Sequence, residues 1–74
     1  MKIDLDAALG RLLKERRLAL HLTQADNGLR SGLTPRNIRK VEQRLACPTV
    51  NAFVKLALAV EISPTELMQK LLDS

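Results

Sequence analysis

The chain has 74 residues, a length that suits one domain with a small hydrophobic core. Hydrophobic residues make up 46% of it and charged residues 27%, which argues against a disordered chain. Phe53 is the sole aromatic residue, which argues against base-stacking sites for RNA or single-stranded DNA, while the net charge of +4 favours an acidic partner such as duplex DNA.

Cysteine content and hydropathy exclude further classes. The single cysteine, Cys47, allows no intrachain disulfide and offers no metal-ligand set, so we expect no cofactor and interpret it as a half-buried loop thiol in a reducing cytoplasm. No apolar run approaches the roughly 18 residues of a membrane span. We therefore expect a cytoplasmic protein with no membrane contact.

A first helix is predicted over residues 6–19 or 6–20, after a short arm from which Asp4 or Asp6 caps it. Its leucines form an amphipathic stripe. Arg17 falls on the boundary of that stripe, where a buried arginine is costly without an anion. We predict that Glu42 is this partner and that the pair ties the first helix to the third.

Residues 23–44 are predicted to form two helices joined by a tight turn. Thr23 caps the first, over residues 24–31, with Asp26 at capping-box spacing, and Gly32 supplies a positive φ at the turn. The helix over residues 24–31 is the weak element of the fold, since polar or small residues occupy positions that a packed helix usually fills with apolar ones. These residues are Asn27, Gly28 and Ser31.

The second helix of this pair is predicted over residues 35–44, with Thr34 as its cap and Pro35 at its first position. Its apolar residues share one arc, and cations and amides share the other. The apolar arc contains Ile38, Val41 and Leu45; the polar arc contains Arg36, Arg39, Lys40 and Gln43. Residues 30–44 hold five bases against one acid, so the positive charge concentrates here.

Two further helices are predicted, over residues 50–60 with Thr49 as cap and from Pro64 onward with Ser63 as cap. On both helices the apolar surface is wider than packing against one neighbouring helix requires. We predict that the surplus in residues 50–74 forms a homodimer interface, a wider intrachain core being the alternative. The predicted interface comprises Val54, Leu58, Leu67, Met68, Leu71 and Leu72.

From Leu9 to about Leu67 the chain resembles the XRE, or Cro/cI-type, helix-turn-helix proteins. The matching features include Arg17, the Thr23-Gln24 start, Gly28, Gly32, Ile38 with Val41 and Glu42, Pro48-Thr49 and Leu56-Ala57. The resemblance implies an all-α fold, a compact five-helix lambda-repressor-like DNA-binding domain with the helix-turn-helix at its second and third helices. The whole chain, residues 1–74, would form that one domain.

The resemblance also implies roles for individual residues. Arg36, Asn37 and Lys40 would contact base edges; Gln24, Thr34, Arg39 and Gln43 would contact the DNA backbone or the groove rim. Arg17 and Glu42 resemble the family's structural ion pair. The chain departs from the family pattern at Asn27 and Ser31, usually aliphatic, and at His21, Arg44 and Glu61, where or near which glycine is usual.

The leading hypothesis is a dimeric, sequence-specific regulator of transcription, a repressor that reads a palindromic operator in double-stranded DNA. The alternative is a DNA-binding antitoxin, or another regulator whose apolar surface binds a protein partner such as a toxin. An enzyme is the least favoured interpretation, because one histidine, one cysteine and scattered acids pair no nucleophile with a base.

Overall fold

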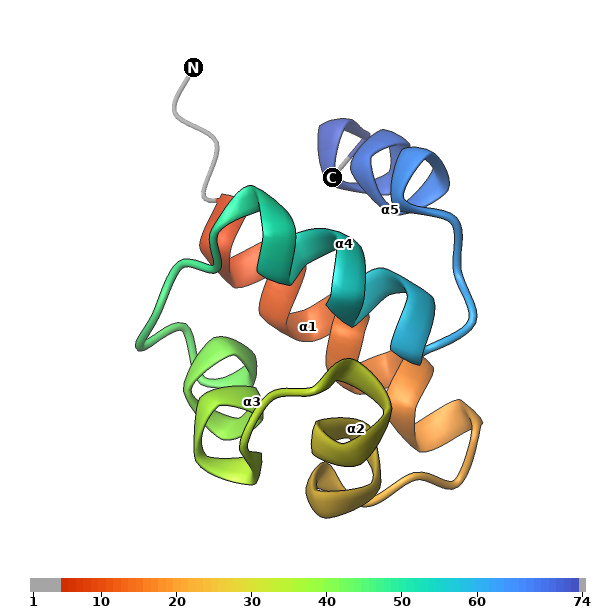
Figure 1. Cartoon of the computed structure of the whole chain (residues 1–74). Coiled ribbons are helices and arrows are strands. Elements are labelled where there is room, and N and C mark those ends of the chain that lie inside the picture. Colours follow the sequence, from red (N-terminus) through yellow and green to blue (C-terminus); the bar gives the residue numbers. More distant parts are fainter. Residues whose placement is uncertain (1–4, 74) are drawn as a thin grey trace.

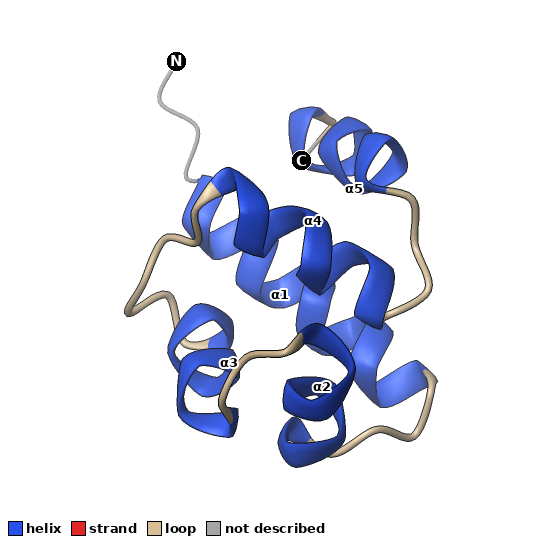
Figure 2. Cartoon of the chain, viewed as in Figure 1, coloured by secondary structure: helices blue, strands red, loops and turns tan. Residues whose placement is uncertain are grey.

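The computed structural model describes residues 5–73, which form five helices and no strand (Figures 1 and 2). The helices are α1 (Leu5–Ala19), α2 (Gln24–Ser31), α3 (Pro35–Glu42), α4 (Val50–Ala59) and α5 (Pro64–Leu72). In this part of the chain, no helix combines the length and apolar character needed to cross a membrane. Asp4 lies outside the described residues, and Asp6 falls within the first turn of α1, so it does not cap that helix.

The helices surround α1 and α4, which form the middle of the molecule (Figure 1). α3 packs against α1 and α2, while α2 also packs against α4. On the opposite side, α5 contacts α4 and α1. The helix-turn-helix pair therefore occupies one side of the molecule and the C-terminal helix the other.

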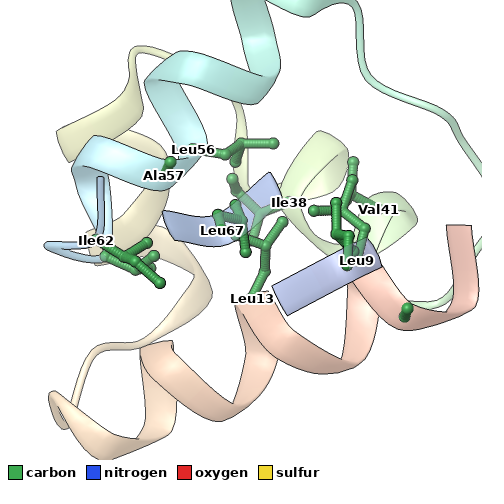
Figure 3. Close-up of a cluster of buried hydrophobic side chains, with 11 residues drawn as sticks. Leu9, Leu13, Ile38, Val41, Leu56, Ala57, Ile62 and Leu67 are labelled. Atoms are coloured by element: carbon green, nitrogen blue, oxygen red, sulfur yellow. The ribbon is translucent and has the colours of Figure 1, made fainter. Parts of the chain in front are cut away.

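The core lies where four of the five helices converge (Figure 3). Its largest fully buried side chains are Leu13, Ile38, Leu56 and Leu67, from α1, α3, α4 and α5 respectively. α2 contributes no apolar side chain to this core, because its buried residues are Asn27, Gly28 and Ser31. The polar and small residues that made α2 the weak element of the sequence are therefore buried.

Side-chain caps define the starts of four helices. Thr23, Thr34, Thr49 and Ser63 each accept a hydrogen bond from the backbone N–H three residues later. Each was predicted as a cap from the sequence. These side chains satisfy backbone donors that a helix start leaves without an intrahelical partner.

Left-handed residues follow the ends of three helices. His21, Arg44 and Glu61 have φ values of 58°, 64° and 58°, conformations that glycine adopts at much lower cost. They coincide with the positions at or near which the resembled family usually has glycine. The turn at Arg44 ends α3 at Glu42, earlier than predicted, and Leu45 is 70% exposed, so its assignment to the packing face was wrong.

Two arginines bind the carbonyl groups at the end of α4. Arg16 Nη2 lies 3.2 Å from both the Val60 and the Glu61 carbonyl oxygens. Arg30 Nη1 donates to the Ala59 carbonyl oxygen and to the Glu61 carboxylate, at 3.2 Å each. These cations satisfy helix-end acceptors and so link α1 and α2 to the end of α4.

Candidate nucleic-acid interface

α2 begins with a complete capping box. Thr23 Oγ1 accepts from the Asp26 N–H at 3.0 Å, and Asp26 Oδ2 accepts from the Thr23 N–H at 2.9 Å. The Thr23 backbone N–H, and then its side chain, lower the pKa of the Asp26 carboxyl below its ordinary value of 3.8. The box fixes the direction in which α2 leaves the preceding loop and places Gln24 at the first helical position.

The turn between α2 and α3 depends on two glycines. Gly32 has a φ of 74° and its N–H donates to the Gly28 carbonyl oxygen. A Cβ at Gly28 would lie 2.7 Å from the Leu33 carbonyl oxygen and 3.3 Å from the Pro35 nitrogen. Gly28 thus permits a close approach of the turn and the first residue of α3.

α3 presents its first turn and its polar arc outward. Its packing face consists of Ile38 and Val41, which are 1% and 7% exposed. Arg36, Asn37, Arg39 and Gln43 are exposed and Lys40 is half-buried, while Thr34 is exposed and caps the helix by accepting from the Asn37 N–H at 3.2 Å. The spacing of Arg36 and Lys40, and of Arg39 and Gln43, places each pair on one face of the helix.

Glu42, the one acid among residues 30–44, forms a buried ion pair with Arg17. Glu42 accepts two hydrogen bonds from Arg17, at 2.7 Å from Nε and 3.0 Å from Nη2. The two side chains are 9% and 3% exposed, for Arg17 and Glu42 respectively. Arg17 Nη1 also donates to the Leu22 carbonyl oxygen at 2.8 Å, so the arginine joins α1, the following loop and α3.

Gln24 also contacts this ion pair, a bond that sequence reasoning missed. Its Nε2 donates to Glu42 Oε1 at 3.3 Å. The two residues are 18 positions apart and belong to different helices, so only the packing of α2 on α3 reveals the bond.

The C-terminal apolar surface divides into two adjacent stripes. Leu67 and Leu71 are 0% and 4% exposed, so they belong to the intrachain core and their assignment to a dimer interface was wrong. Leu58, Met68 and Leu72 are 60%, 44% and 58% exposed, and Val54 is half-buried. A groove of about 400 Å³ lies between α4 and α5, lined by Val50, Phe53, Val54, Pro64, Thr65, Met68, Gln69 and Leu72.

Cys47 differs from its predicted setting. It is exposed rather than half-buried. A hydrogen bond with Asp6 raises the pKa of its thiol above the ordinary value of 9.0.

Comparison with known proteins agrees with this architecture. The sequence pattern of the family described as Helix-turn-helix matches residues 13–67. Among solved structures, the chain is similar to the restriction-modification controller protein C.AhdI from Aeromonas hydrophila, with 32% identity and a TM-score of 0.79. The similarity covers 84% of this chain and 94% of that one. No protein with a curated function matches the chain. With its capped α2, its glycine turn and its exposed basic α3, the chain belongs to the XRE, or Cro/cI-type, family of helix-turn-helix DNA-binding proteins.

Proposed function

We propose that this protein is a dimeric transcriptional repressor that reads a palindromic operator by placing α3 in the major groove. The observation that carries the proposal is the exposed row of cations and amides on α3. The one acid among residues 30–44, Glu42, is buried in an ion pair with Arg17. The exposed face therefore presents a positive surface to the duplex.

Base recognition would come from three side chains of α3. Arginine and lysine suit the acceptors of guanine, and asparagine suits the donor and acceptor of adenine. We assign Arg36, Asn37 and Lys40 to these contacts, each good bidentate contact being worth about 1–3 kcal/mol of discrimination.

Backbone contacts would set the position of α3 in the groove. We assign these to Gln24, Thr34, Arg39 and Gln43. Gln24 lies at the first position of α2, where backbone N–H groups and the helix dipole attract a phosphate. Such contacts position a protein on the duplex without reading its sequence.

Two copies would give enough contacts for a selective site. A dyad would place the half-sites about 34 Å apart, one turn of the duplex. Exposed Leu58, Met68 and Leu72, with half-buried Val54, supply the apolar surface for this dimer. The similarity to C.AhdI favours control of restriction-modification genes as the setting in which the protein acts.

The exposed α4–α5 groove also supports a second candidate, a regulator that binds a protein partner in the manner of a DNA-binding antitoxin. The two candidates differ in the fate of this groove. A dimer that covers the groove makes it inaccessible to another protein. A dimer that leaves it open favours the second candidate.

The test is selection of bound duplexes from a random DNA pool at about 150 mM salt, with the mass of the protein in solution measured in parallel. We expect a palindromic consensus bound by a dimer. Arg36→Ala should remove the preference at one position of each half-site, while Gln24→Ala should weaken binding to all sequences evenly. An Arg36→Ala variant with an unchanged consensus would contradict the assignment.

A further inference from the structure

One buried junction joins α1 to α2 and α3, the two helices that carry the proposed interface. Arg17 of α1 binds Glu42 of α3 through two hydrogen bonds, at 2.7 and 3.0 Å. Gln24 of α2 donates to the same carboxylate at 3.3 Å. The carboxylate therefore accepts from two neighbouring helices at once.

This arrangement fixes the orientation of the Gln24 amide. An ionised carboxylate only accepts hydrogen bonds, so the amide nitrogen of Gln24, and not its carbonyl oxygen, faces Glu42. That nitrogen carries two hydrogens, and Glu42 Oε1 binds one of them. The second is left to donate to another acceptor.

We propose that the Arg17–Glu42 pair is a positioning device that holds the Gln24 amide ready to donate its second hydrogen to a DNA phosphate. The inference rests on the proposed function and adds Glu42 and Arg17 to the residues that determine affinity. A glutamine free in solvent samples several rotamers and loses that freedom on binding. Gln24 is half-buried and bonded before DNA arrives, so it loses less.

A double-mutant cycle in DNA affinity separates positioning from mere structural support. The variants are Gln24→Ala, the pair Arg17→Met with Glu42→Met, and the triple combination. Methionines replace a buried ion pair with apolar groups, a change that often preserves or raises stability. The pair removes one base and one acid, so the net charge and the salt dependence of binding stay the same.

Binding to the selected operator is measured for each variant, with a melting curve to verify folding. We expect Gln24→Ala and the methionine pair each to weaken binding about tenfold, equivalent to about 1.4 kcal/mol. The triple variant should bind no more weakly than the methionine pair, because an unanchored amide contributes little. Arg39→Ala is the matched control, and its cost should be the same with and without the ion pair.

Two results would overturn the inference while leaving the proposed function intact. One is an equal cost of Gln24→Ala in both backgrounds; the other is wild-type affinity in the methionine pair. A wild-type chain that selects no duplex would overturn both. Should the methionine pair fail to melt cooperatively, Glu42→Gln weakens the acceptor at constant volume, and it should cost about threefold more affinity with Gln24 than with alanine at residue 24, a comparison from which its change of charge cancels.

Discussion

Asn27 is the buried residue whose chemistry fits its surroundings least. It is 1% exposed, and neither its amide nitrogen nor its amide oxygen has a hydrogen-bond partner. Ser31, the other polar residue of this face, differs because its hydroxyl has a partner. It donates to the backbone carbonyl oxygen of Asn27 at 2.8 Å. The stability cost of α2 therefore lies mainly at one side chain.

We predict that Asn27→Leu raises the free energy of unfolding by about 1–3 kcal/mol, since it removes two unsatisfied polar atoms and keeps a similar branched shape. Denaturant unfolding measures the change. Ser31→Ala is the control and should stabilise the protein little or not at all, because its hydroxyl already has an acceptor. A destabilised Asn27→Leu variant would contradict this prediction.

The buried ion pair gives a second prediction for single residues. Glu42→Ala should lower the free energy of unfolding by about 3–5 kcal/mol, because it leaves the Arg17 guanidinium buried without its anion. Thermal and denaturant melting provide the measurement. An unshifted transition would rule out an essential role for the pair in the fold.

Physical reasoning from the sequence identified this pair but not its third member. A single arginine at the edge of an apolar stripe needs an anion, and residues 30–44 offer only Glu42. No comparable argument leads to the bond from Gln24 to Glu42, because a glutamine at a helix start is equally satisfied by water. Its partner depends on how α2 crosses α3, which the sequence pattern does not fix.

Among the elements, helix starts were predictable and helix ends were less so. Cap residues mark where α2, α3, α4 and α5 begin, because their hydroxyls accept from a backbone N–H at fixed spacing. These residues are Thr23, Thr34, Thr49 and Ser63. α2 ends at the predicted Gly32, but α1, α3 and α4 end without the glycine that is usual in the family, at the left-handed residues His21, Arg44 and Glu61. α3 was consequently predicted too long.

We predict that His21→Gly raises the free energy of unfolding by about 0.5–1 kcal/mol, the left-handed penalty less the extra chain entropy of glycine. Glu61→Gly should gain less, because it also removes the ion pair with Arg30 at 3.2 Å. Melting of both variants side by side tests the difference. A larger gain at Glu61 would contradict the role given to Arg30.

For the whole molecule, helical periodicity identified the apolar faces of α4 and α5 without showing which part of each face meets α1. Leu67 and Leu71 point into the core, and the neighbouring Met68 and Leu72 do not. Residues one position apart on a helix differ by about 100° in direction, so a modest rotation of α5 decides which stripe is buried. That rotation is a property of the assembled core.

We predict that Met68→Lys weakens self-association about tenfold or more, because it places a charge in the proposed dimer interface. The monomer should keep its stability, since Met68 is 44% exposed. Sedimentation measures the first effect and melting at low concentration the second. Leu67→Ala provides the contrast, with a loss of about 2–5 kcal/mol in folding stability. Unaltered self-association in Met68→Lys would place the interface elsewhere.

Gly10 of α1 lies against the backbone at the far end of α3. A Cβ there would come within 2.7 Å of the Val41 carbonyl oxygen and 2.9 Å of the Glu42 carbonyl oxygen. The surface on which α3 packs is thus formed by main chain and by buried residues, on the side of the helix away from Arg36, Asn37 and Lys40. The three residues proposed to contact bases can be substituted without disturbing that packing surface. Operator preference is therefore free to diverge between descendants that share one fold.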